Sequence, residues 1–387
     1  MCRGPSMRIG VPTESRSGER RVALVPKDAA ALRDKGASVS IEAGAGERAF
    51  FADKQYEAAG ATVENRDSVL ASADLVLTVN GLSQSDARAS KSSATIVGFL
   101  EPLDDPGAIK ALAHEGLSLL AVEMIPRITR AQGMDALSSM AMIAGYKAVL
   151  LAAQHAPRLF PLMMTAAGTL TPAKVFVIGA GVAGLQAIAT ARRLGAVVEG
   201  YDIRPEVKEQ VESLGASFVE LDVGMDRVSG KGGYAAQQSR EYYRRQQKAL
   251  GDHLSGVHVI ITTAAVPGRK APMLLPTSIT KRLVTGTVVI DLAAERGGNC
   301  ALTVPGEVVT QDGVTVAGPV NLPSSVPTHA SQMYSKNMLG LTSTLVQDGA
   351  LRIDLDDEII RGALVAHGGE IIHPAVKTAV ESVETGQ

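Results

Sequence analysis

A glycine-rich turn between an apolar strand and a helix is the feature that most limits the fold of this chain. Gly179-Ala-Gly-Val-Ala-Gly184 follows the apolar residues 175–178 and precedes a helical pattern over residues 185–193. In such a motif the first glycine permits a tight turn, the second lets the backbone approach a pyrophosphate, and the third lets helix and strand pack closely. The helix N-terminus offers free N–H groups and a positive dipole end to phosphates. The motif therefore predicts a dinucleotide-binding domain with contacts from Gly179, Gly181, Val182 and Gly184.

An aspartate at the end of the next strand completes the pattern. Asp202 lies 18 residues after Gly184, directly behind the apolar residues 197–201. A carboxylate in this place accepts hydrogen bonds from the adenosine ribose and repels a 2′-phosphate, so it favours NAD(H) over NADP(H). The alternative, that Asp202 only caps a turn, leaves the glycines and the helix before it unexplained. Arg204 could receive a 2′-phosphate, but beside Asp202 it is expected to cover the adenine or to bind the carboxylate.

Two segments further along the chain are candidates for the same site. Gly230-Lys-Gly-Gly-Tyr234 lies in a polar stretch between two strands. It is either a mobile lid that closes over the nucleotide or a solvated loop, and the residues alone favour the loop. Thr262-Thr-Ala-Ala265 ends a strand and is expected at the carboxyl edge of the sheet, where ligands bind in such folds. Ala264 and Ala265 are the contacts expected there.

The order of strand and helix signals predicts two Rossmann-like α/β domains with parallel sheets, and NAD(H) bound in the cleft at the second. The chain of 387 residues is long enough for two domains. Signals alternate as far as about residue 137, and a second series follows residue 172. A long alanine- and methionine-rich helix is expected over residues 135–153. The tail is expected to hold a helix and then strands over residues 351–355 and 359–366.

Composition and charge exclude several classes of protein. Lysine and arginine total 38 against 40 acidic residues, which argues against a nucleic-acid binder. Two cysteines cannot form a disulfide framework and favour a reducing, cytoplasmic compartment. The longest apolar stretch, residues 175–191, carries three glycines in its first ten residues and is shorter than the about 20 residues of a membrane span. The N-terminus has no apolar core of a signal peptide. A soluble chain is therefore expected.

No residue pattern indicates acid–base or metal catalysis. Dehydrogenases of hydroxy or amino acids move a proton as well as a hydride, and they need a histidine, lysine or acid beside the nicotinamide. The seven histidines are scattered without an evident partner, and the chain has no CxxC or HxxxH pair. We therefore expect neither a catalytic side chain nor a metal site.

A polar loop before the long helix has two explanations. In Arg127-Ile-Thr-Arg-Ala-Gln-Gly-Met-Asp135-Ala-Leu-Ser138, both Asp135 and Ser138 are suited to cap the helix. Capping leaves Arg127 and Gln132 unexplained. The alternative places the loop across the cleft, where it holds the carboxamide and ribose of a nicotinamide.

Four segments together resemble the proton-translocating NAD(P) transhydrogenase, in particular its soluble NAD(H)-binding component, the N-terminal part of the α subunit. They are Met7-Arg-Ile-Gly-Val-Pro-Thr-Glu, the 127–138 loop, Pro161-Leu-Met-Met-Thr-Ala-Ala-Gly168 and residues 179–195. The resemblance extends from residue 7 to about residue 374. It implies that the loop holds the nicotinamide through Arg127, Asp135 and Ser138, and that Gln132 reaches toward the facing NADP(H) ribose. It also implies that Asp202, Ile203 and Arg204 hold the adenosine, with Gly233 and Tyr234 in a lid.

The resemblance implies an assembly as well. Hydride passes directly between NADH on this chain and NADP⁺ on the NADP(H)-binding domain of the β subunit, with Si-face/Re-face specificity. Membrane-spanning subunits on other chains couple this transfer to proton translocation, and the chain is active only with them. The chain forms a homodimer at the cytoplasmic face of the inner membrane. Residues 1–137 with the returning tail, 328–387, form one domain, and residues 138–327 form the NAD(H)-binding domain.

Alanine dehydrogenase, which shares this fold and the opening motif, is the alternative, and a non-catalytic NAD-binding protein is a third possibility. Three positions argue against alanine dehydrogenase. Its catalytic lysine falls on Asn80, its catalytic histidine on Glu101, and a site aspartate on Glu295. Arg21 does match the arginine that holds the substrate carboxylate. Hydride exchange between two nicotinamides moves no proton at a heteroatom and needs only positioning and exclusion of water, so the missing acid–base groups favour the transhydrogenase.

Overall fold

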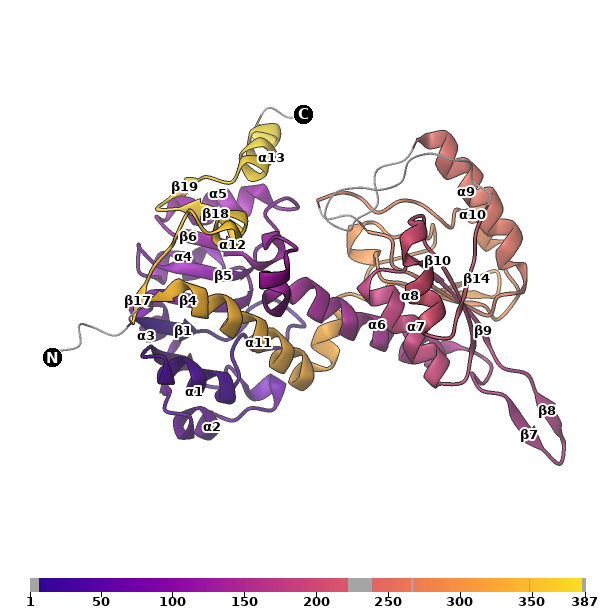
Figure 1. Ribbon diagram of the computed structural model, residues 1–387, viewed down its shortest axis with the longest axis horizontal. Coiled ribbons are helices and arrows are strands. Elements are labelled where there is room, and N and C mark those ends of the chain that lie inside the picture. The colour runs from indigo at the N-terminus through magenta and orange to yellow at the C-terminus, as the bar shows by residue number, and fades with distance from the viewer. Residues whose placement is uncertain (1–6, 222–238, 266–267, 348, 385–387) are drawn as a thin grey trace. The chain divides into compact units, whose positions relative to one another are not determined.

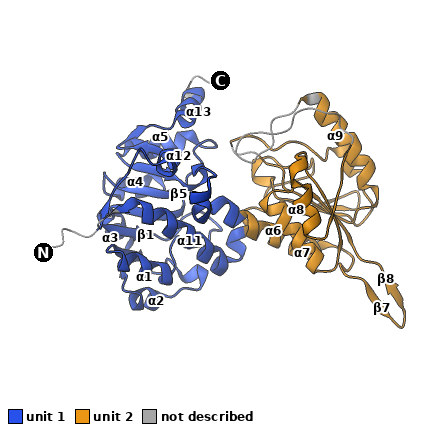
Figure 2. Cartoon of the chain, viewed as in Figure 1, with its two compact units in different colours: residues 1–140, 323–387 blue, residues 141–322 orange. Residues whose placement is uncertain are grey.

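The computed structural model describes residues 7–221, 239–265, 268–347 and 349–384. The chain divides into two compact units, which are Met1–Met140 with Pro323–Gln387 (unit 1) and Ala141–Leu322 (unit 2) (Figure 2). The boundaries expected from the sequence, after residues 137 and 327, lie three and five residues from these divisions.

Unit 1 is built on a sheet in the order β19-β18-β6-β5-β4-β1-β2-β3. Its strands are β1 Arg8–Val11, β2 Ser38–Glu42, β3 Thr62–Glu64, β4 Leu75–Asn80, β5 Thr95–Phe99, β6 Ser118–Ala121, β18 Leu364–His367 and β19 Glu370–Ile371. The strands β1 to β6 are parallel, and β18 and β19 extend the sheet antiparallel beyond β6. The C-terminal tail therefore shares its sheet with the N-terminal block.

Helices surround this sheet, and β4, the fourth strand along the chain, is buried along most of its length (Figure 1). The helices of unit 1 are α1 Pro26–Asp34, α2 Asp53–Ala58, α3 Arg66–Ser72, α4 Gln84–Ala89, α5 Pro106–His114, α11 Pro327–Leu345, α12 Glu358–Ala363 and α13 Pro374–Glu384. Its 3₁₀ turns are η1 Glu47–Ala49, η2 Val122–Met124 and η3 Thr129–Met134, and η8 Leu322–Ser325 lies at the boundary of the units. A minor pair of strands, β16 Val346–Gln347 and β17 Ala350–Leu351, follows α11.

The tail departs from its expected secondary structure. The strand expected over residues 359–366 begins as helix α12, and only its end forms strand β18. Asp357 starts the helix, because its Oδ1 accepts a hydrogen bond from Ile359 N at 2.7 Å and satisfies a free donor of the first turn. A short apolar run does not distinguish a buried helix from a buried strand, and the expectation was wrong for that reason. The run over residues 351–355 contributes only Leu351, to β17.

Unit 2 carries a seven-stranded sheet in the order β11-β10-β9-β12-β13-β15-β14. Its strands are β9 Lys174–Ile178, β10 Val197–Tyr201, β11 Ser217–Phe218, β12 Val259–Thr262, β13 Val288–Asp291, β14 Val308–Gln311 and β15 Val314–Ala317. All pairs are parallel except β14 with β15. The chain leaves β9 toward β10 on one side and returns to β12 on the other. This reversal makes a crevice beyond the carboxyl ends of β9 and β12, the place where open α/β sheets bind ligands.

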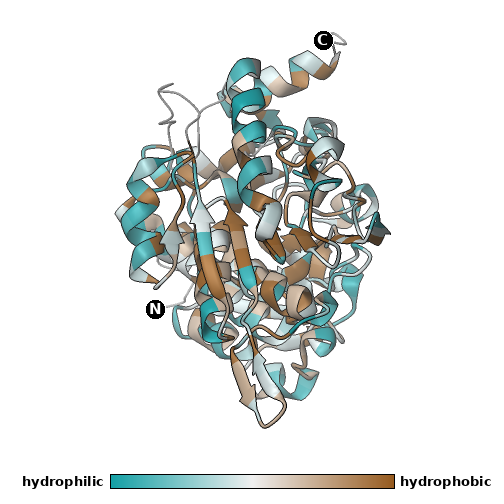
Figure 3. Ribbon diagram, turned by 90° about the vertical axis from the view of Figure 1, so that its right-hand side faces the viewer, coloured by the Kyte–Doolittle hydropathy of each residue, from teal (hydrophilic) through white to brown (hydrophobic). Residues whose placement is uncertain are grey.

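The α/β fold with parallel-rich sheets is confirmed in both units. The helices of unit 2 are α7 Val182–Arg193, α8 Lys208–Ser213, α9 Arg240–His253 and α10 Thr277–Thr280, with the 3₁₀ turns η4 Pro205–Val207, η6 Leu254–Gly256 and η7 Ala294–Arg296. In Figure 3 the strands are largely hydrophobic, whereas many residues of the surrounding helices are hydrophilic. A hairpin of β7 Met163–Thr165 and β8 Gly168–Leu170 projects from this unit (Figure 1).

Helix α6, Ala136–His155, continues from the first unit into the second. Among the described residues it is the one helix that is long and apolar enough to cross a membrane. Its second half packs into the core of unit 2 through Ala148, Val149 and Ala152. A core helix has the same length and composition as a span, so these two properties are weak evidence for a membrane segment.

Candidate functional site

The glycines of unit 2 lie where the crevice beyond β9 requires them. Gly179 has a φ of +98°, and a Cβ there would clash with Thr263 Oγ1. A Cβ on Gly184 would clash with the carbonyl oxygen of Gly179, so only glycine permits this approach of α7 to the turn. A Cβ on Gly181 would meet nothing within 4 Å. Space is therefore open beside Gly181, which caps α7 without a side-chain hydrogen bond to its first N–H groups.

Asp202 ties the end of β10 to the glycine turn. Its Oδ2 accepts hydrogen bonds from Ala180 N at 2.7 Å and from Arg204 Nη2 at 2.9 Å, and its Oδ1 accepts from the main-chain N and the Nε of Arg204, both at 2.9 Å. The carboxylate is nearly buried, with 6% of the side chain exposed. A carboxylate has about four acceptor positions, and these four donors fill them. A further hydrogen-bond donor would reach Asp202 only if the Arg204 guanidinium turned aside.

The segment after β12 is held by a residue that the sequence did not reveal. Ala264 N donates to Asn299 Oδ1 at 3.1 Å, and Asn299 Nδ2 donates back to Ala264 O at 2.8 Å. Asn299 N donates in turn to Asp291 Oδ2 at 2.7 Å. Asp291 is fully buried at the end of β13, and it also accepts hydrogen bonds from Thr262, Ala293, Cys300 and Thr303. The sequence did offer one signal for this cluster, because Asp291 is an acidic residue at the end of a buried parallel strand.

Of the other residues predicted for the site in unit 2, some are described by the structure and two are not. Val182 begins α7, and Ile203 and Ala264 pack at the edge of the hydrophobic core, with Ala265 next along the chain. The structure thus brings the glycine turn, Asp202, Arg204 and the segment after β12 to one edge of the sheet. Gly233 and Tyr234 lie outside the described residues.

The 127–138 loop belongs to unit 1 and forms the turn η3 before α6. Asp135 caps α6, because its Oδ1 accepts from Ser138 N at 2.8 Å and its Oδ2 accepts from Ser138 Oγ at 2.6 Å. The capping roles considered for these two residues are therefore present. Arg127 and Gln132 are both exposed.

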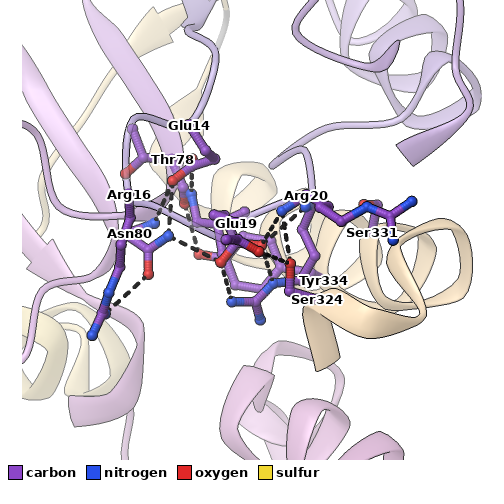
Figure 4. A network of polar contacts seen from close by, with 12 residues as sticks. Glu14, Arg16, Glu19, Arg20, Thr78, Asn80, Ser324, Ser331 and Tyr334 are labelled. Atoms are coloured by element: carbon purple, nitrogen blue, oxygen red, sulfur yellow. Dashed lines mark hydrogen bonds and ion pairs between the residues drawn. The ribbon is translucent and has the colours of Figure 1, made fainter. Parts of the chain in front are cut away.

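A largely buried polar network lies at the carboxyl ends of β1 and β4 in unit 1 (Figure 4). Glu14 accepts hydrogen bonds from Val79 N at 2.6 Å and from both nitrogens of Asn80 at 3.0 Å. The Asn80 amide also donates to Glu19 Oε2 at 3.1 Å. Glu19 forms a buried ion pair with Arg21, in which the Nε and Nη2 of Arg21 donate at 2.8 and 2.6 Å. Arg21 is therefore engaged by a carboxylate of its own chain.

Asn80 and Glu101, where alanine dehydrogenase would have its catalytic lysine and histidine, lie in or beside this network. Asn80 bridges two glutamates through its amide, which does not titrate near neutral pH and so cannot act as an acid or a base. Glu101 is exposed and pairs with Arg16 at 3.2 Å. Its backbone N–H and that of Leu100 both donate to Glu123 Oε1. Within the described residues, no group of three or more metal-ligating side chains is suited to hold a metal ion.

The pKa values of the buried glutamates shift in opposite directions. Burial raises the pKa of Glu14 and of Glu123 from 4.5 to about 7, against hydrogen bonds that lower it. Burial has the same effect on Glu19, but the hydrogen bonds and charge of Arg21 outweigh it and lower the pKa of Glu19 to about 2.

Comparison with known proteins identifies the family of the chain through two family models that together cover most of it. The chain matches the alanine dehydrogenase/PNT N-terminal domain over residues 10–144 and the alanine dehydrogenase/PNT C-terminal domain over residues 148–374. It is 42% identical over 383 residues to the NAD(P) transhydrogenase subunit alpha of Cereibacter sphaeroides, and the matched region covers 97% of this chain and 73% of that protein.

Solved structures agree with this match. A crystal structure of transhydrogenase from Sinorhizobium meliloti superposes with a TM-score of 0.85 at 40% identity, covering 94% of this chain and 100% of that one. An L-alanine dehydrogenase superposes with a TM-score of 0.81 at 25% identity, covering 97% and 100%. The chain therefore belongs to the alanine dehydrogenase/PNT family and, within it, to the NAD(P) transhydrogenase α subunits.

Proposed function

We propose that this chain is the NAD(H)-binding component of a proton-translocating transhydrogenase. Hydride passes directly and stereospecifically between NADH on this chain and NADP⁺ on the NADP(H)-binding domain of the β subunit. Membrane-spanning subunits couple the transfer to proton movement, and the chain is active only with them. The observation that carries the proposal is the crevice at β9 and β12, where an open glycine turn and a buried carboxylate at the end of β10 meet.

The residues at this crevice fit NAD(H). The open space beside Gly181 and the uncapped first turn of α7 suit a pyrophosphate, which the free N–H groups stabilise. Asp202 suits the adenosine ribose and disfavours a 2′-phosphate by charge repulsion. Asn299 fixes the main chain of Ala264 at the edge of the crevice. Bound NADH supplies the hydride, and these side chains bind and orient it.

The 127–138 loop supplies the contacts to the nicotinamide in this proposal. Arg127, Asp135 and Ser138 hold the carboxamide and ribose, and Gln132 reaches toward the NADP(H) of the partner domain. Direct hydride transfer between two nicotinamides requires close, oriented reactants and exclusion of water rather than an acid–base group. The contacts proposed for Gly233 and Tyr234 fall outside the described residues.

Imine chemistry of the alanine dehydrogenase kind is disfavoured by the network in unit 1. Arg21 would have to release Glu19 before it received a substrate carboxylate, and breaking a buried ion pair costs about 3–5 kcal/mol. Asn80 and Glu101 provide no lysine or histidine to move the proton. A reversible oxidation of an amino acid at this site would therefore lack both its anchor and its acid–base catalyst.

The decisive experiment measures hydride transfer by the purified chain with and without an NADP(H)-binding transhydrogenase domain. NADPH serves as donor and an oxidised NAD analogue as acceptor, and the absorbance of the reduced analogue is recorded. Transfer that requires the added domain is the expected result. Absence of transfer despite proven NADH binding would leave a binding protein only, and activity with pyruvate and ammonia would establish the alanine dehydrogenase alternative.

Gln132→Asn is expected to slow hydride transfer about tenfold while the dissociation constant of NADH stays within about twofold, because the shortened amide loses its contact across the interface. Single-turnover transfer and a separate NADH titration provide the two values. Gln332→Asn on α11 makes the same chemical change outside the loop and serves as control. Equal losses in transfer and binding would contradict a role for Gln132 across the interface.

We further propose a homodimer in which the β7–β8 hairpin contacts the second copy. Two-stranded hairpins have little stability of their own in water. This one exposes 55% of Leu162, 76% of Met164 and 51% of Leu170, apolar surface that association would cover. The dimer sits at the cytoplasmic face of the inner membrane through its partner subunits.

Leu170→Asp is accordingly expected to weaken the dimer at least tenfold, because the interface would have to bury a new charge. Analytical ultracentrifugation of a dilution series should show the variant shifting toward the 40.2 kDa monomer at concentrations where the parent is dimeric. Leu355→Asp places the same charge on an apolar residue of unit 1 that is 48% exposed, and it should leave association unchanged. A Leu170 variant that associates like the parent would exclude the hairpin from the interface.

A further inference from the structure

The η3 turn that carries Gln132 is anchored on its inner side by helix α11. Asn337 of α11 donates from Nδ2 to Gly133 O at 2.9 Å. Ala131 and Met134 are buried, and a Cβ on Gly340 of α11 would lie only 3.3 Å from Met134 Cγ. One face of the turn is thus packed against α11, with the main chain fixed one residue after Gln132.

An ion pair fixes the same turn from helix α12. Arg130 Nη1 and Nη2 donate to the two carboxylate oxygens of Asp357, both at 2.8 Å. The pair is bidentate, a geometry that fixes direction as well as distance. Asp357 is itself held in place because it caps α12 through Ile359 N at 2.7 Å. The hydrogen bond and charge of Arg130 keep the pKa of Asp357 below its usual value, so the pair stays charged at neutral pH.

The exposure of this pair indicates that stability is not its main contribution. Arg130 is 56% exposed and Asp357 is 19% exposed. Ion pairs with a solvent-exposed partner contribute little to folding, because water screens the charges. What the pair does determine is the direction of the chain at residue 130, two residues before Gln132. The Gln132 side chain is exposed and makes no hydrogen bond within the described residues.

We propose that Arg130, Asp357 and Asn337 are positioning residues that hold the η3 turn so that Gln132 is presented in one orientation. The inference rests on the proposed function, in which Gln132 contacts the facing nucleotide. Fixed points lie on either side of Gln132, at Arg130 and Gly133, and this restricts the turn before the partner domain docks. Such preorganisation matters because a displacement of about 1 Å at a reacting centre slows transfer by up to about a hundredfold.

Two conservative variants separate positioning from a structural role. Asp357→Asn retains a side chain that caps α12 but loses the charged fork. Arg130→Lys retains the positive charge but loses the paired donors. Arg361→Gln is the matched control, since it removes an exposed arginine of α12 whose side chain makes no hydrogen bond or ion pair with the described residues. Hydride transfer by all three is measured with the full chain assembled with its partner subunits.

Both test variants are expected to lower the maximal rate of hydride transfer about tenfold, with the NADH dissociation constant within about twofold of the parent. Hydrogen exchange of a peptide spanning residues 129–135, measured by mass spectrometry on the chain alone, is expected to accelerate at least fivefold. The melting temperature is expected to change little. Arg361→Gln should match the parent in every measurement.

The possible failures are distinguishable. Parent transfer rates and parent exchange in Asp357→Asn and Arg130→Lys would overturn the positioning role while leaving the proposed function intact. Losses of rate, NADH binding and melting temperature in proportion would show a structural role instead. No transfer by the parent assembly would refute the proposed function, and the exchange measurement would still show whether the pair holds the turn.

Discussion

Asp202→Ala is expected to raise the dissociation constant of NADH about 10- to 100-fold. Hydrogen bonds to a charged group contribute about 1.5–3 kcal/mol each, and a factor of ten in affinity corresponds to about 1.4 kcal/mol. The variant loses the acceptor for the ribose and also the bond that ties Ala180 N to the end of β10. Titration of NADH by fluorescence or calorimetry provides the value.

The same substitution should change the choice of cofactor. In the parent, Arg204 is bound by both oxygens of Asp202. Without the carboxylate, the guanidinium is released beside the position of the 2′-phosphate, and the repulsion of that phosphate disappears. The ratio of NADPH to NADH affinity is therefore expected to rise. Glu209→Ala removes an exposed carboxylate from α8 and should leave both affinities unchanged. Unchanged NADH affinity in Asp202→Ala would exclude this residue from the ribose.

Glu123→Gln is expected to remove part of the loss of stability that the parent suffers between about pH 4.5 and pH 7. Burial raises the pKa of Glu123 from 4.5 to about 7, so the folded chain holds this proton more tightly than the unfolded chain does. A group with a raised pKa stabilises the fold below its unfolded pKa, and this contribution is lost as the pH rises through the folded value. Geometry agrees, because Oε1 accepts from Leu100 N whereas Oε2 is buried without a donor in the described part of the chain.

The size of this effect follows from the pKa shift. A shift of one unit corresponds to about 1.4 kcal/mol, so the stability of the variant relative to the parent should improve by about 3 kcal/mol from pH 4.5 to pH 8. Urea unfolding followed by circular dichroism at both pH values tests this. Glu57→Gln, at an exposed position on α2, should show no such change. A constant difference between Glu123→Gln and the parent would show that Glu123 titrates at its ordinary pKa.

Glu14 should add to the same loss of stability near neutral pH, whereas Glu19 should affect stability only at acidic pH. The pKa of Glu14 is also raised to about 7, so its contribution has the same sign and pH range. The pKa of Glu19 is lowered to about 2, and its stabilisation is present at neutral pH and is lost as the pH falls from about 4.5 toward 2. Glu123→Gln should therefore reduce the neutral-pH slope without abolishing it, and leave the acid slope intact.

Features that depend on short stretches of chain were predictable. The glycine turn, its strand and its helix are consecutive, and the steric need for glycine at 184 arises inside one strand–turn–helix unit. The capping of α6 by Asp135 likewise follows from a spacing of three residues. Local patterns indicated the α/β class for the same reason, since each strand and helix signal spans only a few residues.

Features that join distant segments were not predictable. Asn299 holds Ala264 from 35 residues away, because β12 and β13 lie side by side and bring their following loops together. Asn80 bridges Glu14 and Glu19 for a similar reason, since β1 and β4 are neighbours in the sheet. The ion pair between Arg130 and Asp357 spans 227 residues. No pattern in one stretch of sequence records such partners.

The sequence by itself determined the α/β class, the glycine turn of the second unit and the family to which the chain belongs, because these depend on residue types at short spacing. Only the tertiary structure decided which side chains are buried and which partners they bind. It placed all four acceptor positions of Asp202 against Ala180 and Arg204, engaged Arg21 with Glu19, and fixed the η3 turn to α11 and α12. Charge pairing and burial depend on which elements the sheet order makes neighbours, and that order is set by the packing of the whole unit.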